Sequence, residues 1–478
     1  MTNKKSIVMV ILLSMYVFAL QGQNSGWDWV RSFGGVEVNS YDYANPGERF
    51  DFLASDQSNN IYVAGRMLDE AIAGDIHLHG NGDFDVVVAK LNPQGQYIWA
   101  TNLGGTKKDL PTGLSLDANG NVYLTGLFSG TLKVGGFTLQ SWGYSDIFVA
   151  KITSEGIWQW VSQAGSQIAR EDEFEGEILD ELGEFSFDIQ TNEQGSSVVL
   201  GIAHGLAQFG SNSLNCRGEE WFLASIDTGG NWTWAKSLGE RINGEKIYSM
   251  AMTLDREHYI LSVASAGSED EIIEPGVGYT PDIPGLLLIS KHNLNGETLW
   301  ETTTSMSPLY IKRLISDETG NVYIAGIGDV VGYGEQSLHE EGIAFVAKVD
   351  SLGSYNWIRV ISSDNYEEST FNLAIGSDSK LYVLSETSNL VGGFPYRAIE
   401  SHHAMLSAYD TDGKFLWAQS FGEGSSEISF KAPGLILDTQ NRIIVSGNFD
   451  GEVSLGQFRL NSDYWSDAFV GRFLAPGR

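Results

Sequence analysis

The side chains most able to do chemistry are acidic residues gathered in two short stretches of the sequence. The first stretch, 170–184, reads REDEFEGEILDELGE, and the second, 268–285, has three consecutive acids after its first residue. Carboxylates at this density could attract Ca²⁺ or a basic patch on a partner, or act as an acid and base pair on a glycosidic bond. The candidate binding residues are Glu171, Asp172, Glu173, Glu175, Asp180, Glu181, Glu269, Asp270 and Glu271.

The spacing of these acids specifies none of the three chemistries. The first stretch lacks the spaced ligands and the glycine of an EF-hand loop, and no member can be assigned as a general acid or base. We name no catalytic and no cofactor-binding residue, and calcium is the one metal that the acids suggest. A solvated acidic insertion is the alternative that needs no ligand.

Other reactive groups do not form a recognisable motif. Cys216 is the only cysteine, so no intramolecular disulfide can form, and no histidine partner marks it as a nucleophile. The sequence also contains no nucleophile elbow, phosphate-binding glycine loop or paired cysteine and histidine ligands. Whether the protein is an enzyme stays open, and a non-catalytic role is favoured.

Charge and the N-terminus indicate where the protein works. With 29 basic and 61 acidic residues, the formal charge of −32 disfavours nucleic acid and anionic membranes. Lys4 and Lys5 precede an apolar run from Ile7 to Leu20, which predicts a signal peptide over 1–23. We expect the mature protein, 24–478, to be a bacterial monomer that is secreted or periplasmic and has no transmembrane segment. Its expected partner is a protein or glycan at the cell exterior, and attachment to the cell surface is left open.

The elements that must position any site form an internal repeat. Residues 117–160 align with 56–99 without a gap, which places Gly126 on Gly65 and Asp146 on Asp85. The same segment aligns with 438–477. Each copy carries four apolar runs, such as TGLSLD, NVYLTG, DIFVAK and WQWVSQ, and these runs predict four strands, a to d.

Tryptophan marks strand d in every copy. In six copies a glycine stands four residues before the tryptophan, which indicates a tight hairpin between strands c and d. At one fixed place per repeat, these rings are expected to pack between neighbouring sheets rather than to stack on sugars. The structural tryptophans are Trp29, Trp99, Trp160, Trp234, Trp300, Trp357 and Trp417.

The two ends of the chain complete each other. Trp29 has Gly34 five residues later, as Trp99 has Gly104, so the chain begins with a d strand and its final copy stops after strand c. Strand 27–35 is therefore expected to complete the blade formed by about 430–478, which removes an exposed sheet edge. The prediction is an all-β, seven-bladed β-propeller with four-stranded antiparallel blades and a single domain.

This order of strands predicts where function would lie. The d-to-a and b-to-c connections open on one face, and both acidic stretches belong to that set. Long loops on a rigid scaffold are common binding sites. Asp85, Asp146 and Asp467 recur just before strand c, and their repetition favours a role in fixing the preceding loop.

Two family resemblances follow from these motifs. The strands at 123–126 and 146–151 resemble those of the bacterial exported beta-propeller repeat family, which implies architecture and export but no common activity. The segments 409–417 and 293–300 are similar to the tryptophan motif of quinone-cofactor propellers, which implies a quinone, although no contact residue for one is identified.

The leading hypothesis is an exported, non-catalytic binding or scaffold propeller that presents a loop-rich face to a protein or glycan. One alternative is a propeller hydrolase or lyase acting on extracellular carbohydrate. The other is a calcium-stabilised structural propeller.

Overall fold

A computed structural model describes residues 26–35, 47–167, 184–242, 245–267, 286–304, 307–329, 343–362, 371–386, 404–422, 430–462 and 466–475. Every helix or strand within these ranges is a β-strand. The predicted signal peptide and the two acidic stretches, apart from Glu184, lie outside the described residues. No described segment is a helix of the length and apolarity that crossing a membrane would need.

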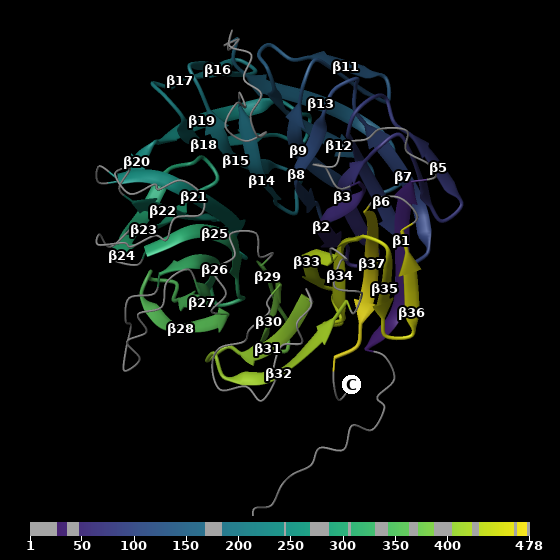
Figure 1. The fold of residues 1–478 in the computed structure, drawn as a ribbon. Coiled ribbons are helices and arrows are strands. Elements are labelled where there is room, and N and C mark those ends of the chain that lie inside the picture. Colours follow the sequence, from purple (N-terminus) through teal and green to yellow (C-terminus); the bar gives the residue numbers. More distant parts are fainter. Residues whose placement is uncertain are drawn as a thin grey trace, which may run out of the picture.

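The strands form seven antiparallel blades around one axis (Figure 1). Blade 1 contains β2 (Arg49–Ser55), β3 (Ile61–Met67), β6 (Asp85–Leu91) and β7 (Tyr97–Leu103). Blade 2 contains β8 (Asp109–Leu116), β9 (Val122–Phe128), β12 (Asp146–Ile152) and β13 (Trp158–Gly165). Blade 3 contains β14 (Phe185–Thr191), β15 (Ser197–Ala203), β18 (Glu220–Ile226) and β19 (Trp232–Gly239).

The remaining blades repeat this order. Blade 4 contains β21 (Glu245–Leu254), β22 (Ile260–Gly267), β23 (Leu286–His292) and β24 (Thr298–Thr304), with the short β20 (Arg241–Ile242) beside β21. Blade 5 contains β25 (Ser307–Ser316), β26 (Val322–Asp329), β27 (Ile343–Val349) and β28 (Tyr355–Ser362). Blade 6 contains β29 (Phe371–Ile375), β30 (Lys380–Glu386), β31 (Ala404–Asp410) and β32 (Phe415–Phe421).

Blade 7 closes the ring with both ends of the chain. Its strands are β33 (Phe430–Leu437), β34 (Ile443–Phe449), β37 (Asp467–Phe473) and β1 (Trp27–Gly35). β1 pairs antiparallel with β37, and Ser32 lies opposite Phe469. The innermost strands also contact one another in a closed circle, from β2 through β8, β14, β21, β25, β29 and β33 back to β2. The predicted fold and its closure are therefore confirmed.

Within the described ranges, four blades carry an additional hairpin in the connection from strand b to strand c. The hairpins are β4 (Glu70–Ala73) with β5 (Ile76–His79), β10 (Thr131–Val134) with β11 (Phe137–Gln140), β16 (Leu206–Phe209) with β17 (Asn212–Asn215), and β35 (Glu452–Leu455) with β36 (Phe458–Asn461). Two of them extend the outermost strand of the preceding blade, since β4 pairs with β1 and β16 pairs with β13. The sequence comparison missed these hairpins and treated the connections as loops.

The repeated tryptophans join one blade to the next. The indole nitrogen of Trp99 donates a hydrogen bond of 3.0 Å to the carbonyl of Ser154 in the hairpin of blade 2, and Trp160 bonds Thr228 of blade 3 in the same way at 2.9 Å. Each ring also covers the hairpin glycine, so that a Cβ on Gly156 would lie 2.9 Å from the ring of Trp99. The c–d hairpins therefore need glycine for space as well as for conformation.

We expect Gly95→Ala to lower the free energy of unfolding by about 2–4 kcal/mol. Gly95 has a φ of +75°, and a Cβ there would lie 2.5 Å from the ring of Trp29, so alanine is strained and also displaces the closing strand. Gly136→Ala is the matched control, because a Cβ at Gly136 would have no atom within 4 Å. Thermal unfolding of both variants measures the effect, and equal midpoints would contradict the packing argument.

Candidate functional site

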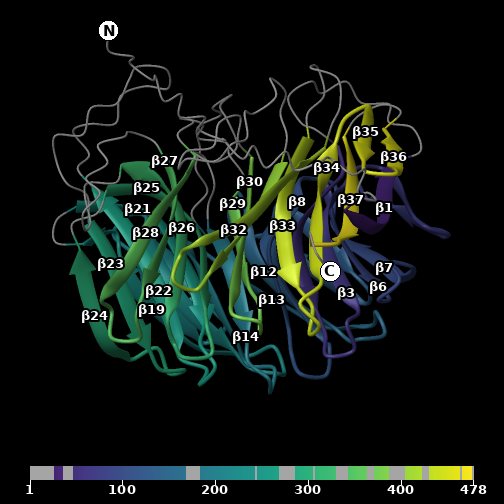
Figure 2. The ribbon, with the colours of Figure 1, turned by 90° about the horizontal axis from the view of Figure 1, so that it is seen from below.

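The predicted acidic binding residues are not among the described residues, so the structure leaves that hypothesis as a prediction. The strands that flank the two stretches are β13 and β14 for the first, and β22 and β23 for the second. Because each of these connections is of the d-to-a or b-to-c type, their strand ends lie on one face. Figure 2 shows the hairpin β35–β36 at this end of the blades, and we call it the loop face.

The recurring acids before strand c hold the preceding turn. Asp85 accepts a hydrogen bond of 2.8 Å from the backbone N–H of Asn81, and Asp146 accepts one of 2.8 Å from Trp142. Asp85 and Asp146 are also fully buried. The proposed role of these two acids in fixing the loop is confirmed.

Each of these acids has an acidic neighbour at the start of the next blade. Three seams between blades carry such a pair, namely Asp467 with Glu48, Asp85 with Asp109, and Asp146 with Glu184. In two pairs the backbone fixes the approach, since the N–H of Glu48 donates to Ser466 and that of Asp109 donates to Phe84, both at 2.8 Å. The second member of each pair, Glu48, Asp109 or Glu184, is at most 2% exposed.

Burial governs the ionisation of these pairs. It raises the pKa of Asp109 to about 8, with a further contribution from the charge of Asp85, and it raises the pKa of Glu48 to about 8. The pKa of Asp85 rises to about 6, also chiefly through burial. At neutral pH, Asp109 and Glu48 therefore hold protons. Their inaccessibility prevents contact with a sugar, so these acids do not supply the carboxylates of a glycoside hydrolase.

Metal and thiol chemistry find little support in the described part of the chain. Those residues contain no group of three or more histidine, cysteine, aspartate or glutamate side chains placed to hold a metal ion. Burial, together with the charges of Glu220 and Glu184, raises the pKa of the Cys216 thiol to about 11. The thiol therefore stays protonated and is a poor nucleophile. The calcium prediction concerns the acidic stretches and stays a prediction.

A pocket of about 350 Å³ opens at the inner ends of blades 1, 2 and 3. The first residues of the innermost strands β2, β8 and β14 reach it, which places it at the loop face beside the axis. We call it the hub pocket. Its lining residues are Arg49, Asp51, Phe52, Arg66, Leu110, Pro111, Thr112, Leu127, Phe185 and Phe187.

Aromatic packing holds one wall of the hub pocket. The ring of Phe187 stacks on Trp221 with centroids 4.8 Å apart, and Phe185 meets Phe187 edge to face at 4.6 Å. Phe187 is nevertheless 38% exposed, so this wall presents apolar surface to the solvent. A supported but accessible ring is suited to contact with a ligand.

The opposite wall of the hub pocket carries charge. Arg49 donates from Nε to Asp51 at 2.7 Å, and its side chain remains 42% exposed. Arg66 is buried; its Nε donates to the carbonyl of Gly47 at 3.3 Å and its guanidinium group lies 4.3 Å from the ring of Phe84. Two guanidinium groups thus share a pocket with one carboxylate.

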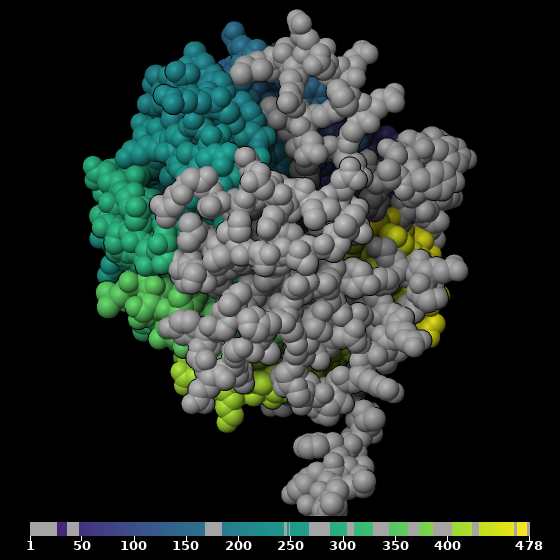
Figure 3. All heavy atoms as spheres, turned by 60° about the vertical axis from the view of Figure 1, so that its left-hand side comes forward, coloured from purple at the N-terminus to yellow at the C-terminus, as the bar shows by residue number. Residues whose placement is uncertain are grey.

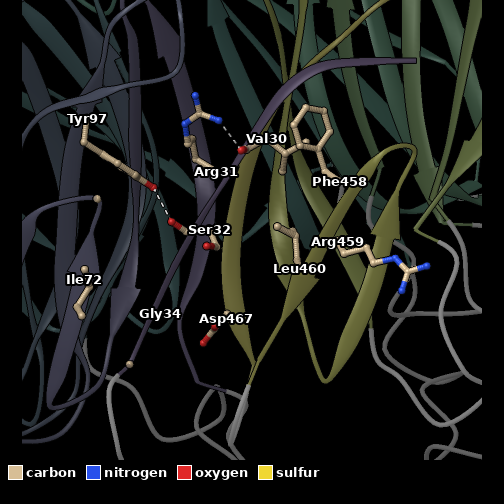
Figure 4. A pocket seen from close by; sticks show the side chains of 12 residues that line it. Val30, Arg31, Ser32, Gly34, Ile72, Tyr97, Phe458, Arg459, Leu460 and Asp467 are labelled. Atoms are coloured by element: carbon tan, nitrogen blue, oxygen red, sulfur yellow. Dashed lines mark hydrogen bonds between the residues drawn. The ribbon is translucent and has the colours of Figure 1, made fainter. Parts of the chain in front are cut away.

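A second pocket, of about 440 Å³, lies at the outer rim where the ring closes. It is bounded by β1 and the hairpins β4–β5 and β35–β36 (Figure 4). Its two arginines do not converge: Arg31 bonds the carbonyls of Val30 and Gln94, while Arg459 extends away from the pocket toward Glu452. The third charged residue of the lining, Asp467, belongs to the acid pair with Glu48. This pocket therefore offers a groove without a focused binding group.

Two aromatic side chains stand out on the loop face between β11 and β12. Trp142 is 42% exposed and Tyr144 is 54% exposed. Exposed tryptophan and tyrosine provide rigid contact area for protein or glycan partners. The described part of the loop face thus combines the hub pocket with an exposed aromatic pair. Figure 3 shows the described blades following one another around the rim in chain order, from teal through green to yellow.

Sequence comparison did not single out the residues of the hub pocket. Phe185 and Phe187 alternate in the run FSFDIQ, which marks a half-buried strand but not a ligand wall. Arg49 and Arg66 lie in strands a and b of blade 1, where the aligned residues of blade 2 are Leu110 and Leu127. The two arginines at positions where the repeat has leucine were the sequence signal that could have indicated the hub pocket.

No family model matches the sequence, and no curated protein is similar to it at a significant level. Among solved structures, the chain is similar to a protein of unknown function from Dyadobacter fermentans, with 12% identity, 93% of this chain and 99% of that chain covered, and a TM-score of 0.40. It is also similar to BamB from Moraxella catarrhalis, with 13% identity, coverages of 88% and 100%, and a TM-score of 0.35. YCF48 bound to D1 peptide shows 9% identity, coverages of 93% and 98%, and a TM-score of 0.41. These likenesses concern the fold alone.

Proposed function

We propose that the protein is an exported, non-catalytic binding or scaffold propeller that presents its loop face to a protein or glycan outside the cell. The exposed aromatic pair Trp142 and Tyr144 beside a rigid ring is the observation that carries this proposal. Export rests on the predicted signal peptide over 1–23, and membership of the bacterial exported beta-propeller repeat family rests on the repeat motifs.

The proposal predicts that binding depends on one face of the ring. We expect the double variant Trp142→Ala/Tyr144→Ala to bind at least about tenfold more weakly than the wild type, because such aromatic anchors supply much of the energy of an interface. The measurement is binding of the labelled full chain to immobilised extracellular polysaccharides and purified surface proteins of a producing bacterium.

Leu352→Ala is the matched control for this experiment. Leu352 is 83% exposed but lies in the hairpin between β27 and β28, on the opposite face. The control should bind as the wild type does. Equal binding by the double variant, or turnover of a polysaccharide that depends on a single carboxylate, would overturn the proposal.

A further inference from the structure

The hub pocket concentrates positive charge in a strongly acidic protein. The chain has a formal charge of −32, yet two arginine side chains and one aspartate line this cavity. Burial lowers the pKa of Arg66 to about 10, and the nearby charge of Arg49 contributes to the shift. The Arg66 guanidinium group therefore remains charged at neutral pH, and it lines the same small cavity as Arg49.

Three acids near the pocket, Asp51, Glu48 and Asp83, offset part of this charge at Arg66. Asp51 is bound to Nε of Arg49, and within the described part of the chain the terminal nitrogens of Arg49 donate no hydrogen bond. Glu48, next to Arg49 in the chain, is buried, and its carboxyl accepts a bond from the N–H of Leu68. The raised pKa of Glu48, about 8, leaves it neutral at pH 7. Among the lining residues, an anionic group therefore meets two guanidinium groups and one carboxylate.

The remainder of the pocket favours an apolar body. Six of its ten lining residues are apolar, namely Phe52, Leu110, Pro111, Leu127 and the two phenylalanines of β14. A volume of about 350 Å³ lies within the usual range for small-molecule sites. The lining thus combines one charged side with one apolar and aromatic side, across which a ligand with two unlike ends would be oriented.

We propose that the hub pocket binds a small amphipathic carboxylate, whose anionic group contacts Arg49 and whose apolar or aromatic group packs on Phe187. Arg66, which is buried in the lining, contributes positive potential, and Trp221 holds the ring of Phe187 in place. This site goes beyond the proposed macromolecular binding, because a ligand of this size needs no partner on the aromatic pair. The two proposals can therefore fail separately.

The probe is N-acetyl-L-phenylalanine, and its uncharged amide is the matched control ligand. Titration calorimetry of the full mature chain is expected to show millimolar or tighter binding of the acid and at least about tenfold weaker binding of the amide, since a charged hydrogen bond is lost. Absence of acid binding in the millimolar range, or equal binding of acid and amide, would overturn the proposal.

Two pairs of variants locate the binding. Arg49→Gln and Phe187→Ala are each expected to lower the affinity for N-acetyl-L-phenylalanine by about tenfold, because they remove the anion contact and the apolar wall, respectively. Arg256→Gln and Leu352→Ala should not change it: Arg256 is also an exposed, ion-paired arginine, but it lies in the turn between β21 and β22 on the opposite face. Thermal unfolding first establishes that all four variants fold. If folded Arg49→Gln bound N-acetyl-L-phenylalanine with unchanged affinity, the ligand would bind elsewhere and the proposal for the hub pocket would be wrong.

Discussion

Trp27→Ala is expected to lower the free energy of unfolding by about 3–5 kcal/mol, the usual cost of removing a large buried aromatic side chain. Trp27 is 2% exposed and belongs to the N-terminal strand. Its ring meets Phe421 of blade 6 edge to face at 5.2 Å and Phe473 of blade 7 at 5.4 Å. The substitution therefore leaves a cavity at the point where the ring is closed.

Urea unfolding monitored by circular dichroism measures this loss, and Trp142→Ala supplies the control. Trp142 is 42% exposed, so its replacement is expected to change stability by no more than about 0.5 kcal/mol. Limited proteolysis should also cut the Trp27→Ala variant first near β1 and β32, since local opening follows lost packing. An equal loss of stability in both variants would show that the N-terminal strand is not a structural part of blade 7.

The closure at Trp27 and Trp29 was predictable because it depends on local spacing. The interval from Trp29 to Gly34 identifies a d strand without reference to the rest of the chain, and a d strand without a, b and c needs a partner elsewhere. The pairing of Ser32 with Phe469 then follows from the ring. Repetition made this inference possible, since each blade supplies an independent copy of the same pattern.

The additional hairpins were not predicted because their strands are too short to show a period. β4, β5, β10 and β11 have four residues each, which is below the length at which alternation is informative. The four hairpins share a glycine at the turn, with positive φ at Gly74, Gly135, Gly210 and Gly456. A comparison of these four glycines across copies would have revealed the hairpins.

The candidate sites were harder to predict because they lie between blades. Asp85 was recognised as a recurring acid, but its pairing with Asp109 depends on how one blade packs on the next. The hub pocket depends in the same way on three strands, with Arg49 from one blade and Phe187 from another. A repeat alignment emphasises what the copies share, whereas this pocket arises where blade 1 differs from them.

The buried acid pairs make stability depend on pH in a direction opposite to that of ordinary salt-bridged carboxylates. The pKa of Asp109 rises from an unfolded value near 4 to about 8 in the folded protein. The folded state therefore binds the proton more tightly, and the stability that this group contributes is greatest below about pH 4 and is lost as the pH rises to about 8. Asp109 accepts a backbone N–H bond of 2.7 Å from Gly105 and a longer one of 3.4 Å from Ser129. Asp109→Asn removes this titration and imitates the protonated form, and its amide oxygen can keep the shorter bond from Gly105.

We therefore expect Asp109→Asn to match the wild type within about 1 kcal/mol near pH 5 and to exceed it by about 2–5 kcal/mol near pH 9. Thermal unfolding from pH 5 to 9 measures the difference, and Asp350→Asn is the control. Asp350 also accepts two backbone N–H bonds, from Leu352 and Ser354, but it does so in an exposed turn, so its variant controls for the exchange of a carboxylate for an amide outside the seam. A wild-type curve parallel to that of Asp109→Asn would mean that Asp109 is ionised in the folded protein, and the seam between blades 1 and 2 would then have to accommodate a buried negative charge.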